Sequence, residues 1–261
     1  MKLPAAAAES CELAAGVVAL APGLAWLPAA RALVAADAHF AYEDVIGGAL
    51  PLWSTAELVA TLLQAARRRA VREIVLLGDV VHGARMSEGA MRTVAAALDA
   101  LRAEAAVTLV AGNHEGRSRA FAVLGATAEA IERDGWLLLH GDRPALRAAG
   151  ADAPGRALIG HLHPSLRVGG RKSVPAFVAG ERLVVLPALT PYSSGLDVLS
   201  AEFAAALGGW PAQRGELHVV AAANERLYPF GNLAALSGLL RAAAPRAKPQ
   251  RFPRSRLRRY D

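Results

Sequence analysis

The chain has 261 residues, 54% of them hydrophobic, so it is long enough to bury a substantial core. Its single cysteine, Cys11, excludes an internal disulfide framework and is typical of a reducing compartment, so we expect a cytoplasmic protein. Residues 246–261 hold seven basic residues and one acid, and therefore carry the whole net charge of +6. We predict one domain over residues 1–244 and a basic, disordered tail over residues 245–261.

The uncharged stretch over residues 13–30 is interrupted by glycine and proline, and it predicts a β-hairpin over about residues 15–30. We expect its strands at residues 17–20 and 24–27, and we expect no membrane span here or elsewhere. Residues 31–39 predict a buried strand whose apolar run ends at Asp37 and His39. Because residues i and i+2 of a strand point to one face, these two side chains should project together.

Helices and strands then alternate. A helix is predicted from a cap at Ser54 or Thr55 to about Arg69, and a second helix over residues 87–104. Buried strands are predicted at residues 72–77 and 107–110. This alternation is typical of a parallel sheet with helices on both faces, in which ligands bind beyond the carboxyl ends of the strands.

The second half of the chain is richer in strand patterns. We predict strands at residues 135–139, 157–159, 174–178, 183–186, 196–199 and 218–221, the last being the final strand of the chain. These strands predict a second sheet packed on the first.

Polar residues follow the predicted strands at five places. They are Asp37 and His39, Asp79 and His82, Asn113 and His114, His140, and His161 and His163. Six of the seven histidines belong to this set, and only His218 stands apart. Ligands of this kind at the ends of neighbouring strands predict a metal site.

Two neighbouring divalent metals need a bridging ligand, and the Asp79 carboxylate is the candidate. One metal would be completed by Asp37, His39 and one of the two histidines His161 and His163. The other metal would take Asn113, His140 and the remaining histidine. Nitrogen and oxygen ligands without thiolate suit Mn, Fe, Zn or Ni.

The motifs Asp-x-His, Gly-Asp-x-x-His, Gly-Asn-His-Glu, His-Gly and Gly-His-x-His occur in this order within residues 15–200. The chain thereby resembles the calcineurin-like metallophosphoesterases. Its hairpin before the first motif and its residues 160–164 and 186–196 are similar to the bacterial ligase-associated DNA damage response phosphoesterases.

The resemblance implies an α/β fold, an αββα sandwich in which two mixed sheets pack face to face and are flanked by helices. It implies two divalent metals, manganese ahead of the alternatives, with His163 on the metal of Asp37 and His39 and His161 on that of Asn113 and His140. It also implies DNA as a partner, together with a DNA ligase, a helicase and an exonuclease of the same repair system.

We predict that the protein hydrolyses phosphodiester bonds of DNA by attack of a hydroxide bound between the two metals. The resemblance assigns His114 a general-acid or transition-state role. His82 is predicted to position the substrate, with a hydrogen bond to a metal ligand as its alternative role. Substrate contacts are predicted for Arg85, Arg117, Arg167 and Tyr192.

Besides the DNA phosphodiesterase, two other functions stay open on the sequence alone: a phosphohydrolase of small substrates and a non-catalytic scaffold. The basic tail favours nucleic acid, because clustered cations neutralise backbone phosphates. The nearly neutral remainder of the chain favours a small nucleotide or a phosphomonoester instead. The third possibility is a non-catalytic scaffold. The complete ligand set argues against it, because such scaffolds typically lose ligands.

Overall fold

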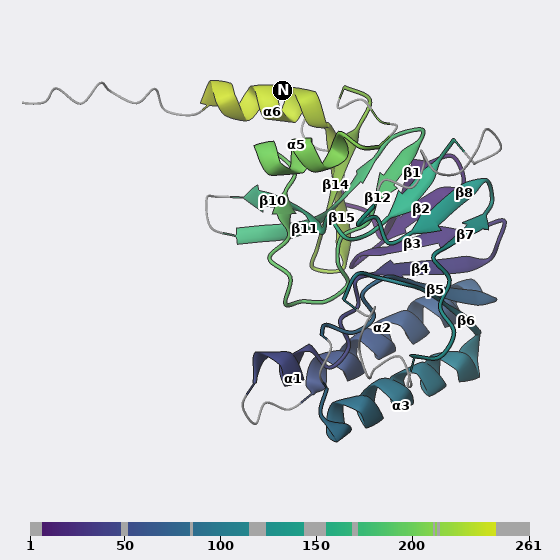
Figure 1. Ribbon diagram of the computed structural model, residues 1–261. Helices are drawn as coiled ribbons and strands as arrows, with labels where there is room; N and C mark the ends of the chain where they lie inside the picture. Colours follow the sequence, from purple (N-terminus) through teal and green to yellow (C-terminus); the bar gives the residue numbers. More distant parts are fainter. Residues whose placement is uncertain are drawn as a thin grey trace, which may run out of the picture.

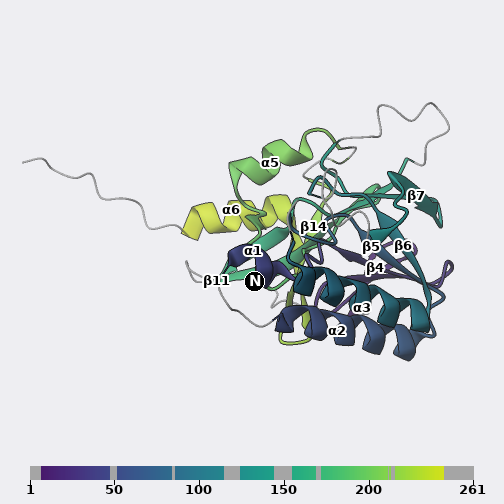
Figure 2. The ribbon, with the colours of Figure 1, turned by 60° about the horizontal axis from the view of Figure 1, so that its bottom comes forward.

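The computed structural model describes residues 7–47, 52–83, 86–114, 124–143, 155–168, 172–210, 212 and 215–243. Two β-sheets pack face to face, and helices cover the outer face of each sheet (Figure 1 and Figure 2). The predicted αββα sandwich is therefore confirmed. The predicted tail lies outside the described residues, and no helix in the described part of the chain is long and apolar enough to cross a bilayer.

The first sheet has six strands, which follow one another in chain order. They are β1 (Ser10–Ala14), β2 (Val17–Leu20), β3 (Leu24–Leu27), β4 (Ala32–Ala36), β5 (Glu73–Leu77) and β6 (Ala106–Val110). β1 to β4 are paired antiparallel, whereas β4, β5 and β6 run parallel. The predicted hairpin is present as β2 and β3, and β1, which the sequence did not predict, extends it.

Two helices connect the parallel strands and pack on one face of this sheet: α2 (Trp53–Arg69) and α3 (Glu88–Glu104). The Oγ of Ser87 caps α3 by accepting a hydrogen bond from the first turn. The predicted cap of α2 is wrong. Ser54 and Thr55 lie inside that helix, and their polar groups bind the short helix α1 (Tyr42–Ile46) and the residue before it.

The second sheet has nine strands, in the order β13-β10-β11-β12-β9-β8-β7, with β14 paired to β11 and β15 to β14. They are β7 (Ala130–Arg133), β8 (Trp136–Leu139), β9 (Ala157–Ile159), β10 (Pro164–Val168), β11 (Lys172–Ala179), β12 (Leu183–Val185), β13 (Leu196–Asp197), β14 (His218–Ala223) and β15 (Arg226–Asn232). The prediction that the strand at residues 218–221 is the last one is wrong. This strand is β14, and β15 follows it in a hairpin. The outer face of this sheet carries α5 (Ala201–Leu207) and α6 (Leu233–Ala243).

Alternate residues of the central strands face two different cores. Leu33 and Ile74 pack toward α2 and α3, whereas Val34 and Val75 pack against the second sheet. Both faces of β4 and β5 are therefore buried, which explains their uninterrupted apolar sequences. The prediction of helices on both faces of one sheet is wrong, because the second sheet occupies the inner face.

A polar clamp joins the two sheets at one edge. Glu73 of β5 accepts two hydrogen bonds from the guanidinium of Arg133 on β7, each 2.7 Å long, and a third from Thr108 of β6. These charge-assisted bonds lower the pKa of Glu73 below its ordinary value of 4.5, although burial opposes the shift. The clamp should therefore stabilise the packing of the sheets in a pH-dependent way.

We expect Glu73→Gln to lower the free energy of unfolding by about 1–3 kcal/mol at pH 7, because it removes the charge from this pair. Since the folded pKa lies below the unfolded one, the contribution is complete above about pH 4.5 and is lost as the pH falls through the folded pKa. The free energies of unfolding of the wild-type and variant proteins should therefore converge at low pH. Denaturant unfolding of both proteins at several pH values measures this. Glu104→Gln, which breaks the exposed pair with Arg67, is the matched control and should cost less than about 1 kcal/mol.

Candidate metal centre

The candidate ligands lie where strands of both sheets end. Asp37 follows β4 and Asp79 follows β5 in the first sheet, whereas His140 follows β8 and His161 follows β9 in the second. The carboxyl ends of parallel strands share one edge of a sheet, so the packing of the two sheets brings both sets of side chains together.

Left-handed backbone conformations turn these side chains inward. The φ angles are 51° at Asp37, 45° at His39, 41° at Asp79, 59° at His161 and 41° at His163. Residues with a Cβ adopt this region rarely and at a cost, and such residues concentrate at functional sites. The alternation of a strand, from which we predicted that Asp37 and His39 project together, is not the reason that they do, because β4 ends at Ala36.

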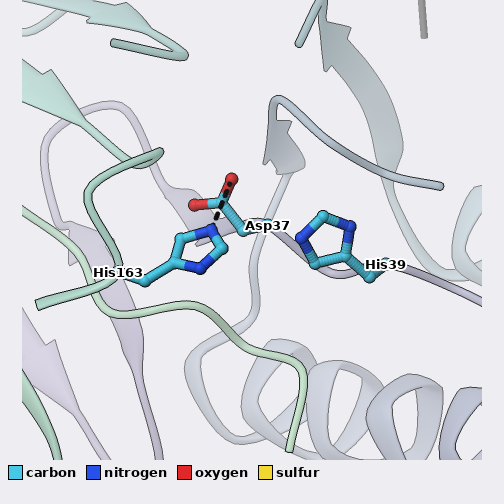
Figure 3. Close-up of side chains that lie close together, drawn as sticks. All are labelled: Asp37, His39 and His163. Carbon is cyan, nitrogen blue, oxygen red and sulfur yellow. Dashed lines mark ion pairs between the residues drawn. The ribbon is translucent and has the colours of Figure 1, made fainter. Parts of the chain in front are cut away.

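The first ligand cluster consists of Asp37, His39 and His163 (Figure 3), with one candidate ligand atom from each within 4.8 Å of the others. Asp37 is fully buried, and its Oδ1 lies 3.3 Å from His163 Nε2. Ser193 Oγ lies 2.7 Å from His163 Nδ1, the other ring nitrogen, and so fixes the orientation of the imidazole.

The second ligand cluster consists of Asp79, His140 and His161, whose candidate ligand atoms also lie within 4.8 Å of one another. His140 Nε2 is 3.5 Å from Asp79 Oδ2 and 3.1 Å from His161 Nδ1. The Oδ1 of Asn113 lies 2.8 Å from His140 Nε2 and adds a fourth polar atom to this cluster. The structure thus brings His140, His161 and Asn113 together, and places His163 with Asp37 and His39.

The polar atoms of the site fit bound cations. Among the described residues, four buried side-chain atoms lack a hydrogen-bond partner: Asp37 Oδ1, His140 Nδ1, His163 Nε2 and Ser165 Oγ. Three of the four belong to the two clusters, whose carboxylates and imidazoles form a donor set for Mn, Fe, Zn or Ni. Because an unpartnered buried polar atom costs free energy, a ligand for these atoms is expected.

Burial keeps most of these imidazoles neutral. It lowers the pKa of His39 to about 3, an effect that the Asp37 carboxylate opposes and the neighbouring imidazoles reinforce. Burial likewise lowers the pKa of His140 and of His161. For His163 burial also favours the neutral form, but the adjacent Asp37 carboxylate outweighs it and raises the pKa. Neutral imidazole is the form that binds metals.

Three glycines make room for these side chains. A Cβ at Gly78 would overlap the His140 ring, and one at Gly112 would overlap both the Asp79 carboxylate and the Asp79 backbone. A Cβ at Gly160 would lie 2.5 Å from Asp37 Oδ2. The glycines of the sequence motifs are therefore required by close approach to the ligands.

His114 and His82 lie at the open side of the site. The His114 backbone N–H donates to Asp79 Oδ1 at 3.0 Å, and its Nε2 is 3.7 Å from Asp79 Oδ2. The His114 side chain is 37% exposed, so a substrate can reach it. The His82 ring stacks on His114 with ring centroids 4.3 Å apart, and its Nδ1 lies 3.2 Å from His39 Nδ1.

The predicted substrate residues are only partly placed. Arg85 and Arg117 lie outside the described residues. Arg167 is exposed on β10, and Tyr192 is 43% exposed in the loop that carries Ser193. Ser193 and the buried Glu43 were not predicted from the sequence, because neither stands at the end of an apolar run.

Comparison with family models finds a match over residues 30–173, more than half of the chain, to the calcineurin-like phosphoesterases. The chain belongs to the calcineurin-like phosphoesterase family. It is thus a metal-dependent phosphoesterase, and the two clusters are where it could hold divalent cations.

A crystal structure of Pseudomonas putida nuclease MPE is similar to this phosphoesterase in fold, with a TM-score of 0.63. The two share 23% sequence identity, and the match covers 86% of this chain and 100% of the other. Comparison with curated proteins found no match.

We expect Gly112→Ala to disrupt the site of the phosphoesterase, because the new methyl group would displace the Asp79 carboxylate. Metal content measured by mass spectrometry should fall, and phosphoester hydrolysis should fall at least about tenfold, the range seen when the supports of metal ligands are removed. Gly89→Ala is the matched control. Gly89 lies in α3, where the added Cβ would be 3.7 Å from Ser87 Oγ, an ordinary contact distance. This variant should change neither quantity. Equal metal content in the two variants would contradict this account of Gly112.

Proposed function

We propose that the protein is a phosphodiesterase that cleaves DNA with two divalent cations, manganese being the native metal. The observation that carries the proposal is the pair of largely buried clusters at one edge of the sandwich, in which Asp37 Oδ1, His140 Nδ1 and His163 Nε2 have no hydrogen-bond partner. A phosphoesterase with this arrangement can bind one phosphate group against two cations.

The proposed ligand sets follow the two clusters. Asp37, His39 and His163 would hold one cation, whereas Asn113, His140 and His161 would hold the other. Asp79 would contribute its carboxylate to both. The cations, when bound, would supply Lewis-acid activation of water and neutralise charge on the phosphoryl oxygens.

His114 is proposed as the general acid of the reaction. It is anchored to Asp79 through its backbone, and its ring is accessible at the mouth of the site. A proton held at its imidazole can pass to the leaving oxygen as the ester bond breaks. His82, stacked on His114 and beside His39, keeps both rings in place and is proposed as a positioning residue.

DNA is the proposed substrate on three grounds. The similar fold belongs to a protein described as a nuclease, the tail over residues 246–261 is strongly basic, and Tyr192 stands exposed beside the site. Arg85, Arg117 and Arg167 are proposed phosphate contacts. We further propose a cytoplasmic role in DNA repair, with a ligase, a helicase and an exonuclease as partners.

The test is hydrolysis by purified protein of bis-p-nitrophenyl phosphate, p-nitrophenyl phosphate and DNA, with Mn²⁺, Fe²⁺, Zn²⁺ or Ni²⁺. We expect diester and DNA cleavage that chelation by EDTA abolishes and that Mn²⁺ restores best. Asp79→Ala should abolish turnover. His114→Ala should lower kcat about 10²–10⁴-fold, the usual size of a general-acid contribution, while metal content stays unchanged.

His218→Gln is the control variant for this assay, since His218 lies on β14 outside both clusters, and it should retain full activity. Turnover of the monoester without cleavage of diester or DNA would replace the proposal with a small-substrate phosphohydrolase. No turnover by protein that binds two metals would leave a non-catalytic scaffold.

A further inference from the structure

Exposed apolar side chains gather beside the metal centre. Among the described residues, five large hydrophobic side chains are strongly exposed: Val45, Ile46, Trp53, Tyr192 and Phe230. All but Phe230 belong to α1, to the first residue of α2, or to the loop over residues 187–195. Trp53 is the most exposed, at 72%. Exposed apolar groups concentrated at one place indicate a binding surface.

The aromatic rings of this region form a continuous row that ends at the site. Tyr192 stacks on Tyr42 with ring centroids 5.2 Å apart and an interplanar angle of 22°. Tyr42 meets His82 at 4.7 Å, and His82 stacks on His114 at 4.3 Å. Tyr192 also precedes Ser193, which orients the ligand His163. The outermost ring is thus tied to the metal centre by two routes.

A buried carboxylate holds the outer ring in place. Glu43 is only 3% exposed, and its Oε1 accepts hydrogen bonds from the Ser54 backbone N–H (2.9 Å) and from the Tyr192 hydroxyl (3.2 Å). Its Oε2 accepts a further bond from Ser54 Oγ (2.9 Å). Burial opposes the ionisation of Glu43, but these bonds outweigh it and lower the pKa of the carboxyl group. The charged form therefore fixes Tyr192 relative to α2, whose first residue is Trp53.

We propose that Tyr42 and Tyr192, held by Glu43, form a base-stacking subsite for a nucleotide next to the phosphodiester that is cleaved. The proposal rests on the proposed function and names the part of the substrate that the protein grips besides the phosphate. Tyr42 covers one face of the Tyr192 ring, and the bond to Glu43 holds that ring in place. The other face of Tyr192 is then the one on which a nucleobase would stack. Trp53 directly precedes Ser54, whose backbone N–H donates to the same Glu43 oxygen, so its exposed ring belongs to the same part of the surface.

Stacking of this kind accepts any nucleobase, because every base has an aromatic face. The subsite therefore selects for the presence of a base and not for its identity. It would also favour phosphodiesters of nucleic acid over esters that lack an aromatic group. A structural role alone, in which Tyr192 merely ties its loop to α1, needs the hydroxyl bond to Glu43 but not the ring.

The experiment compares two short fluorescent DNA strands that contain one cleavable phosphodiester each, all other linkages being methylphosphonates. In one strand thymidines flank the cleavable bond, and in the other abasic tetrahydrofuran residues do. We expect the wild-type protein with Mn²⁺ to show a kcat/KM about tenfold or more higher on the strand with bases, the effect of one stacked base. Tyr42→Leu and Tyr192→Leu should bring this ratio close to one.

The ratio distinguishes a lost subsite from a damaged protein, because partial misfolding lowers both rates alike. Tyr192→Phe keeps the ring, loses the bond to Glu43, and should retain most of the ratio. Phe230→Leu, on β15 and outside the row of rings, should retain all of it. If the leucine variants keep the wild-type ratio, as a patch for a protein partner would require, the subsite is refuted while the nuclease proposal stands. Failure of the wild-type protein to cut either strand overturns both.

Discussion

The structure around the metal centre depends on two buried carboxylates, each of which must be surrounded by polar groups. Asp37 is 0% exposed and Asp79 is 2% exposed, and a buried charge is costly unless polar groups surround it. Each carboxylate has one oxygen that accepts a backbone N–H, from His161 and from His114, and another that faces imidazole nitrogens. The glycines before the ligands, the left-handed turns and the packing of strand ends from two sheets all bring these polar groups into contact with the two carboxylates.

The sequence predicted the central part of this fold because its signals are local. β4 and β5 are buried on both faces and read as plain apolar runs, and α2 and α3 show helical spacing. β7 and β15 have mixed burial and no such signal, so they were missed. The ligand types could be read at the strand ends, and their convergence was expected from the shared edge of parallel strands and from the resemblance. The left-handed turns that aim the side chains, such as those at His161 and His163, could not be read, and nor could the way in which two separate sheets meet.

The loop over residues 187–195 shows how one segment supports both the chemistry and the grip on substrate. Its Leu189 N–H donates to the carbonyl of Ala36 at the end of β4, which anchors the second sheet to the first beside Asp37. From this anchor the loop carries Tyr192 to Glu43 and Ser193 to His163. A shift of the loop would therefore change the outer aromatic ring and a candidate metal ligand together. The local sequence does not predict this coupling, because the three partners Ala36, Glu43 and His163 come from separate parts of the chain.

The origin of the first ligand cluster in two sheets has a thermodynamic consequence. Asp37 and His39 belong to the first sheet, whereas His163 belongs to the second, so a cation held by all three would cross-link the two halves of the sandwich. Its binding free energy would then appear as resistance to separation of the sheets, about 4 kcal/mol at a thousandfold excess over the dissociation constant. The melting temperature would in that case depend on free metal concentration by mass action.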